Sequence, residues 1–194
     1  MTFHNFKLQT LGIAAALALG SIAMTGCTTT TADSQASVRA ARQAIDTNVD
    51  ATLSRLYNTV PGSREMVQKA AGVLVFPSMV GGSFVVGAAY GRGALRMDGR
   101  TEGYYSTTAG SIGFQAGGQS KAVIYVFNTR ESLDKFRNSK GWTVGADATV
   151  TIATVGANAS VDNHTIQQPV VGFVLTNVGL EAGASVQGAK INRI

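Results

Sequence analysis

The sequence is poor in the side chains from which most metal and redox sites are built. It has one cysteine, Cys27, and two histidines, His4 and His164. A single cysteine excludes an internal disulfide framework, and one histidine beyond the N-terminal segment with scattered acids does not make a metal-ligand set. We therefore expect no metal and no cofactor, and a fold that is stabilised by packing alone.

Charge of either sign is also sparse. Charged residues make up 14% of the chain, and the formal net charge is +5. This excess is too weak and too scattered to indicate a nucleic-acid partner. It still favours anionic membrane surfaces, which attract a nearby Lys or Arg by about 1 kcal/mol each.

The apolar run at the N-terminus is too short to cross a membrane as a helix. Leu11–Met24 has 14 residues, whereas a spanning helix needs about 20. Lys7 precedes the run, and small residues lead from it to Cys27. This layout is typical of a secretory signal, so we predict a signal peptide over residues 1–26.

The end of that segment, Met24–Cys27, resembles the lipobox of bacterial lipoproteins. The resemblance implies cleavage before Cys27, a diacylglyceryl thioether on its sulfur, and an amine acylated by a fatty acid such as palmitate. Thr28 rather than aspartate follows, a pattern that in Gram-negative lipoproteins resembles sorting to the outer membrane. Two alternatives stay open, namely a secreted protein with an incidental cysteine and a buried N-terminal helix.

The mature chain is predicted to be a short tether followed by one domain. Residues 28–37, TTTTADSQAS, are small and polar without apolar periodicity, which is typical of a flexible linker. We therefore predict a lipidated cysteine and tether over 27–37 and a single domain over 38–194. At this size the domain can bury its own core.

Helical periodicity comes first in the domain. A helix is predicted over Asp33–Tyr57, because Val38, Ile45, Val49 and Leu56 line up on one face. It could lie on a membrane through Arg39, Arg42 and Arg55, or cover the domain's own sheet. The second is favoured, because Asp46 and Asp50 are on it too. Pro61-Gly62 ends it, and Ser63 is predicted to cap a shorter helix, SREMVQKA.

Strands and glycines dominate the rest of the chain, where 19 of the 23 glycines lie between Gly72 and Gly188. Glycine weakens strands, so this density indicates bulges, sharp bends or close backbone approach. We predict an α+β fold with N-terminal helices packed on a strongly curved, barrel-like, mainly antiparallel sheet. The expected strands are Ala71–Phe76 (closed by Pro77), Ser83–Met97 (turned by Asp98-Gly99), Tyr104–Gly118, Ala122–Asn128, Trp142–Val155, Val170–Thr176 and Leu180–Val186, with one inserted helix over Thr129–Ser139.

Two patterns resemble enzyme motifs and fall short of them. Ser111, in Ala109–Gly113, approximates the G-x-S-x-G nucleophile elbow, with Asp147 or Asp162 and then His164 in α/β-hydrolase order. A helix should follow the serine, but FQAGGQS is a poor helix former. Tyr90–Gly93 resembles a phosphate loop but lacks the G-K-[ST] ending, so a bent strand is the better interpretation. We therefore predict no catalytic residues and no enzyme.

Four stretches resemble the SYLF-domain family, in the family's order and over about Glu65–Ile194. They are AAGVLVFPSMVGGSFVVGAAYGRGAL, GSIGFQAGGQSKAVIYVFNTRESLDKF, WTVGADATVTIATVG and GLEAGASVQGAKI. The most specific block is GSIGFQAGGQ, at 110–119. The bacterial lipoprotein branch of the family is the most similar, in agreement with the lipobox.

The resemblance implies lipid binding without catalysis. Eukaryotic members bind phosphoinositides and cortical actin, and a bacterial envelope leaves only the lipid role, toward an anionic phospholipid or a phosphoinositide-like headgroup. Basic residues near the N-terminus engage the membrane in those members, and here Arg39, Arg42, Arg64 and Lys69 occupy the comparable region. The expected protein is a lipid-anchored, outer-membrane lipoprotein facing the periplasm. The alternative is a structural lipoprotein that binds another envelope protein.

Overall fold

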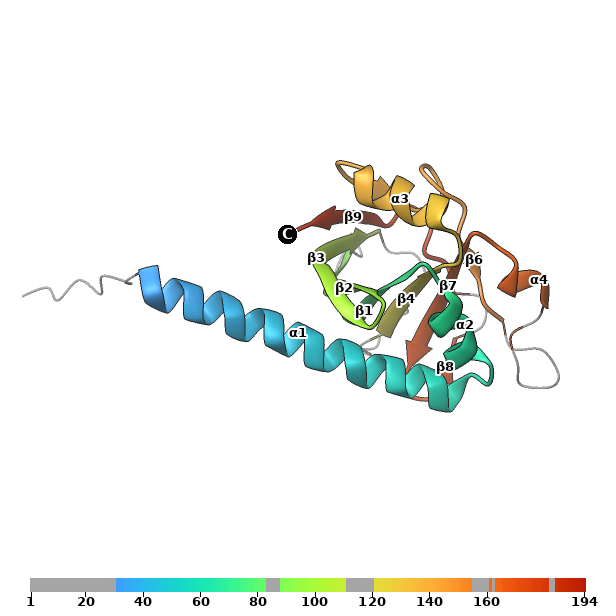
Figure 1. Cartoon of the computed structure of the whole chain (residues 1–194), viewed down its shortest axis with the longest axis horizontal. Helices are drawn as coiled ribbons and strands as arrows, with labels where there is room; N and C mark the ends of the chain where they lie inside the picture. The colour runs from blue at the N-terminus through green and yellow to red at the C-terminus, as the bar shows by residue number, and fades with distance from the viewer. Residues whose placement is uncertain (1–30, 83–87, 111–120, 155–160, 162, 182–183) are drawn as a thin grey trace, which may run out of the picture.

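One curled β-sheet organises the chain in the computed structural model (Figure 1). The structure describes residues 31–82, 88–110, 121–154, 161, 163–181 and 184–194, with side chains at 34–81, 88–110, 121–154, 161, 165–181 and 184–194. The strand order is β5-β9-β3-β2-β1-β4-β7-β6, and β8 also pairs with β7. Among the paired strands of the described residues, β6 and β7 are the one parallel pair. The predicted α+β fold with a curved, mainly antiparallel sheet is confirmed.

The element bounds follow the chain from one long helix into the sheet. The helices are α1 (Thr31–Thr59), α2 (Ser63–Lys69), α3 (Arg130–Asn138) and α4 (Asn163–Ile166). The strands are β1 (Gly72–Gly82), β2 (Ala88–Met97), β3 (Arg100–Ala109), β4 (Lys121–Phe127), β5 (Trp142–Thr143), β6 (Thr151–Ile152), β7 (Val170–Thr176), β8 (Gly179–Leu180) and β9 (Lys190–Arg193).

Each face of the sheet carries its own core. Because successive strand residues point to opposite faces, β1 sends Val73 and Val75 to the outer face and Leu74 to the inner face. Helices α1 and α2 pack on the outer face, whereas α3 packs on the inner, concave face (Figure 1). The inner core is aromatic and includes Phe127, Phe136 and Trp142.

Strand β1 does not end at Pro77 as the sequence predicted. It continues to Gly82 through a bulge that shifts its register against both β2 and β4. Proline lacks a backbone N–H and is tolerated at a bulge, where the ladder is already interrupted. A side chain at Gly93 would collide with the carbonyl oxygen of Val75, so the predicted close backbone approach is real at this position. The Asp98-Gly99 turn is confirmed, with φ of 49° and 74°.

Two predicted strands are mostly irregular. In the described part of Trp142–Val155, which ends at residue 154, only β5 and β6 pair as strands. Asp147 accepts the backbone N–H of Thr143 and folds the segment between them into a turn. Of Leu180–Val186, residues 182 and 183 lie outside the described residues, and among the others only Leu180 lies in a strand. The sequence analysis did not predict β9, which pairs with β3. Alternation predicts an extended chain but does not say which strand edge it meets.

The starts of α1 and α2 differ from the sequence predictions, whereas the predicted inserted helix is present. Residues 31–37 are helical rather than part of a flexible tether. Ser63 does not cap α2, since Gly62 precedes the helix and the Ser63 hydroxyl donates to the carbonyls of Leu56 and Val60. The inserted helix predicted over Thr129–Ser139 is confirmed as α3, which Thr129 caps because its hydroxyl accepts the N–H of Ser132. Within the described ranges, no helix is both long and apolar enough to cross a bilayer.

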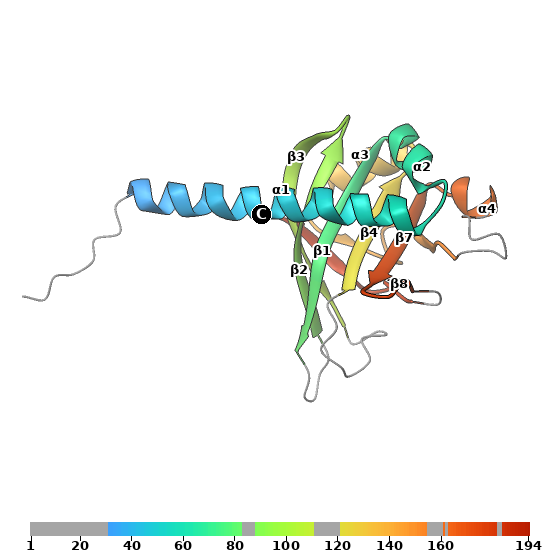
Figure 2. The ribbon, with the colours of Figure 1, turned by 90° about the horizontal axis from the view of Figure 1, so that it is seen from below.

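Helix α1 has a packed half and a free half. The free half, residues 34–44, is exposed throughout and projects past the sheet (Figures 1 and 2). The packed half begins near Ile45, and Val49 and Leu56 are fully buried against the outer face. The predicted apolar face is therefore used only in part, since Val38 remains 48% exposed.

Candidate functional site

A group of polar side chains fixes α1 to the outer face of the sheet. This polar clasp consists of Asp46 and Asp50 on α1 with Arg96, Thr101 and Tyr104 on β2 and β3. The Asp46 carboxylate accepts hydrogen bonds from the hydroxyls of Thr101 at 2.6 Å and Tyr104 at 2.7 Å. The Arg96 guanidinium donates to Asp50 Oδ1 at 2.7 Å and to the Asp46 carbonyl at 3.2 Å. The clasp sets the direction in which α1 leaves the sheet.

The clasp shapes the electrostatics around Arg42. Burial raises the pKa of Tyr104, the hydrogen bond to Asp46 raises it further, and Arg42 acts in the opposite direction. The Arg42 guanidinium lies 5.1 Å from the centre of the Tyr104 ring, within cation–π range. Arg42 is thus oriented by an aromatic face while its side chain stays exposed.

Arg64 has a similar arrangement at the other end of α1. Its guanidinium lies 4.4 Å from the centre of the Tyr57 ring. Burial raises the pKa of Tyr57, and the nearby Arg64 charge lowers it in part. Lys69 is exposed in the last turn of α2.

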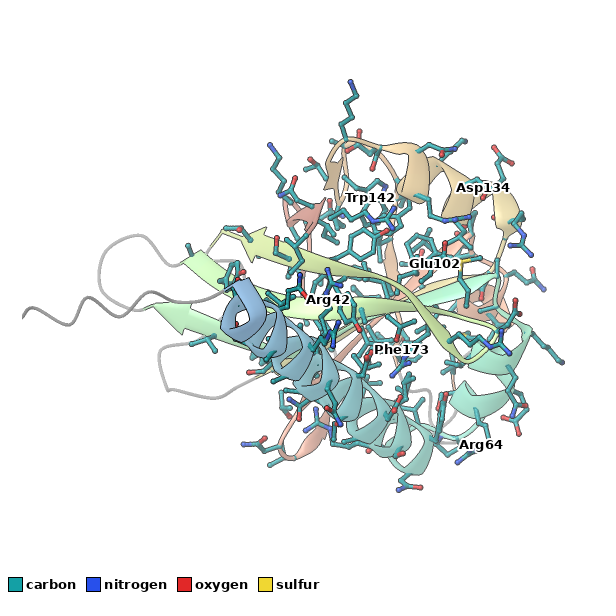
Figure 3. All side chains as sticks on the ribbon, turned by 60° about the vertical axis from the view of Figure 1, so that its left-hand side comes forward. Arg42, Arg64, Glu102, Asp134, Trp142 and Phe173 are labelled. Carbon is teal, nitrogen blue, oxygen red and sulfur yellow. The ribbon has the colours of Figure 1, made fainter. Side chains whose placement is uncertain are left out.

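The four predicted headgroup residues do not converge on one pocket. Arg39 and Arg42 lie three residues apart on the free half of α1, whereas Arg64 and Lys69 lie on α2. Figure 3 shows Arg42 and Arg64 well apart. The helix between Arg42 and Thr59 is about 25 Å long at 1.5 Å per residue. All four side chains are exposed. This arrangement suits contact with an extended surface rather than enclosure of one headgroup.

A groove of about 350 Å³ lies between α1, α2 and the β2–β3 turn. This volume is at the lower limit for a small-molecule site. Its walls combine apolar side chains such as Leu53 and Val67 with the polar groups of Asp50 and Arg96. None of the four predicted basic residues lines it.

The inner face holds a buried ion pair beside a much smaller cavity. Lys121, only 8% exposed, places its Nζ 2.7 Å from Glu181 Oε2. The adjoining cavity measures about 30 Å³ and is lined by Met79, Thr107 and Tyr125 among others. Burial raises the pKa of Tyr125. A space of this size holds one or two water molecules and is too small for an acyl chain.

The hydrolase alternative falls largely outside the described residues. Ser111 and Asp162 lie outside them, and the side chain of His164 is not described. Asp147 is exposed and holds the turn at Thr143. Across the described ranges, no three His, Cys, Asp or Glu side chains group closely enough to bind a metal ion. Cys27 also lies outside the described residues.

The glycine-rich segment Tyr90–Gly93 is a strand, as the sequence analysis favoured, and not a phosphate loop. It lies within β2 and pairs with β1 on one side and β3 on the other. Arg92 points outward, where its Nε donates to the Tyr90 hydroxyl at 3.0 Å.

Comparison with known families identifies the C-terminal part of the chain. A family model described as "Ysc84: Las17-binding protein actin regulator" matches residues 108–193. This match agrees with the resemblance to the SYLF-domain family over the same stretch. The SYLF match begins near the end of β3 and ends in β9, so α1, α2, β1 and β2 lie outside it. No curated protein matches the chain in sequence.

Sequence reasoning missed the residues that position Arg42 and Arg64. Tyr104 and Tyr57 carry those contacts, and Tyr104 is anchored by Asp46, 58 positions away. The one available signal was a pair of acids, Asp46 and Asp50, four residues apart in the predicted helix. That spacing indicates a shared face, but it does not reveal the partner strands.

Proposed function

We propose that this protein is a bacterial outer-membrane lipoprotein, anchored through Cys27 and facing the periplasm, whose domain binds an anionic lipid surface without catalysis. The matched family model describes actin regulators that bind Las17. Actin has no place in a bacterial envelope, so the lipid association implied by the SYLF resemblance is the part that we carry over. The observation that supports it most is the basic, exposed free half of α1.

That free half is suited to electrostatic contact rather than insertion. Between Asp33 and Asp46 it contains Arg39 and Arg42 and no acid. Val38 is its one large apolar side chain, so it lacks the apolar face of a helix that embeds in a bilayer. Each arginine close to anionic lipid contributes about 1 kcal/mol, and salt screens this attraction.

Vesicle flotation tests the lipid-binding proposal directly. The chain from Thr28 onward is suitable, because it contains every described element and both cores begin at or after Ile45. We expect it to float with phosphatidylglycerol vesicles at low salt, to be released at high salt, and to leave phosphatidylcholine vesicles unbound. A further set with a phosphoinositide tests headgroup preference.

Paired variants identify the residues responsible. Arg39→Gln with Arg42→Gln should weaken anionic binding by roughly tenfold or more, from the loss of about 1 kcal/mol per arginine. Arg130→Gln with Lys140→Gln removes the same charge from exposed positions at or beside α3 and should have little effect. Failure of the unmodified chain to float with any of these vesicles would refute lipid binding by the domain.

A further inference from the structure

Helix α1 covers only one end of the outer face of β1–β3. At the end near the Asp98-Gly99 turn, Arg96 bonds to α1 and Val75 is buried beneath it. At the other end the same strands carry Val80 and Tyr90, which are 65% and 46% exposed. These two residues face each other directly across the antiparallel ladder. We call this region, Val80 with Tyr90, Arg92 and Thr108, the uncovered end.

The members of the uncovered end share one face. Tyr90, Arg92 and Ala94 alternate along β2, and Ala94 belongs to the core beneath α1 and α2, so all three point to the outer side. Thr108 is exposed opposite Tyr90 on β3. The Arg92 Nε donates to the Tyr90 hydroxyl at 3.0 Å. Val80 and the Tyr90 ring thus form an apolar pair, and the Tyr90 hydroxyl and the Arg92 guanidinium lie beside it.

The charge around this region is positive. The described parts of β1 and β2 contain no acid, and the one acid of β3, Glu102, lies toward the opposite end and pairs with Arg137. Lys190 on β9 is exposed opposite Thr108. The free half of α1 and this end of the sheet project from the body in different directions (Figure 2).

We propose that the uncovered end is the surface that enters the interface of an anionic bilayer, an inference that rests on the proposed function. Tyrosine is favoured at that depth because its ring is apolar and its hydroxyl polar. Val80 adds apolar area beside it, and Arg92 is placed to contact lipid phosphates. Charge complementarity selects this occupant, because the region is basic and the membrane surface anionic.

A second copy of this chain is a poorer occupant. A stable protein–protein interface buries about 1,200–2,000 Å², and the described residues of the uncovered end offer two large apolar side chains. Two copies would also bring Arg92 and Lys190 of each against the same charges of the other. The same basic surroundings disfavour any partner that is not acidic.

A tryptophan probe at position 90 tests insertion. Tyr90→Trp in the chain from Thr28 is mixed with phosphatidylglycerol vesicles containing brominated acyl chains, which quench tryptophan on contact. We expect its emission to shift to shorter wavelength and to be quenched. The unmodified chain supplies the baseline, because Trp142 is buried in the inner core. Ile166→Trp is the control, since Ile166 is exposed and contacts Asn128 at the opposite end of the sheet.

A second set of variants separates this inference from the proposed function. Val80→Asp with Tyr90→Ser should weaken vesicle binding about tenfold or more, through lost apolar contact, whereas Ile166→Ser should not. If the unmodified chain does not bind anionic vesicles, both proposals fail. If it binds, but these variants bind equally well and Tyr90→Trp is not quenched, this inference alone is wrong. Variants that change sedimentation but not vesicle binding would assign the region to a second copy and also overturn it.

Discussion

At the scale of single residues, Asp46 is the most heavily used polar group on α1. Its carboxylate accepts two hydroxyl hydrogen bonds and lies 3.5 Å from Arg96. Asp50 contacts the same guanidinium but is 68% exposed. The two carboxylates therefore form ion pairs with one arginine in very different environments, which makes them a matched pair for mutation.

We expect Asp46→Ala to lower the free energy of unfolding by about 2 kcal/mol, because it leaves the hydroxyl donors of Thr101 and Tyr104 without their acceptor and removes one of the two carboxylates paired with Arg96. Asp50→Ala should cost less than about 1 kcal/mol, as an exposed ion pair does. Urea denaturation of both variants measures the difference. Equal losses would show that the clasp does not hold α1 as the structure indicates.

At the scale of elements, α1 combines a packed half with an exposed one. Val38 and Leu56 were predicted on the same apolar face, yet Leu56 is fully buried and Val38 is not. Leu56→Ala should therefore lower the unfolding free energy by about 2–5 kcal/mol through the cavity it leaves. Val38→Ala should change it by less than about 0.5 kcal/mol. Thermal and urea unfolding of the two variants would contradict this division of α1 if their losses were similar.

The elements predicted well from sequence are those whose signals are local. The Asp98-Gly99 turn, the capped helix α3 and the apolar strand β7 each depend on residues a few positions apart. The continuation of β1 through Pro77 depends on neighbouring strands that accommodate a bulge. Strand β9 depends on the free edge of β3. Neither of these long-range conditions is visible in a local pattern.

The candidate site shows the same limit. The sequence alone shows that residues 34–44 are basic, and the structure shows that their side chains are exposed. The separation of Arg42 from Arg64 could not, because it depends on the length of α1 and on where α2 returns to the sheet. The pairing of Val80 with Tyr90 depends on the bulged register of β1. The prediction that Cys27 is lipidated stays a prediction.

At the scale of the whole molecule, the proposed anchor and the folded domain are close in sequence. Only residues 28–30 lie between Cys27 and the first residue of α1. Fully extended, the chain from Cys27 to Thr31 reaches at most about 14 Å. If Cys27 carries lipid, α1 starts near the headgroups, and Arg39 and Arg42 are within the reach of the surface when the helix lies along it.

Removal of the anchor should release the protein from membranes at high salt. In Cys27→Ser, only the contacts of the domain itself remain, and salt screens their electrostatic part, whereas multiple acyl chains hold a protein stably. Fractionation of cells in low and in high salt compares the two forms. Retention of Cys27→Ser in the envelope fraction at high salt would contradict the proposed anchor.

The most direct test of the account is an intact-mass spectrum of the protein extracted from its native membrane. We expect a chain that begins at Cys27 and is heavier than the polypeptide by a diacylglyceryl group and one further acyl chain. A chain with an unmodified thiol and amine at Cys27, or one that still carries residues 1–26, would contradict the account of a lipid-anchored membrane-surface protein.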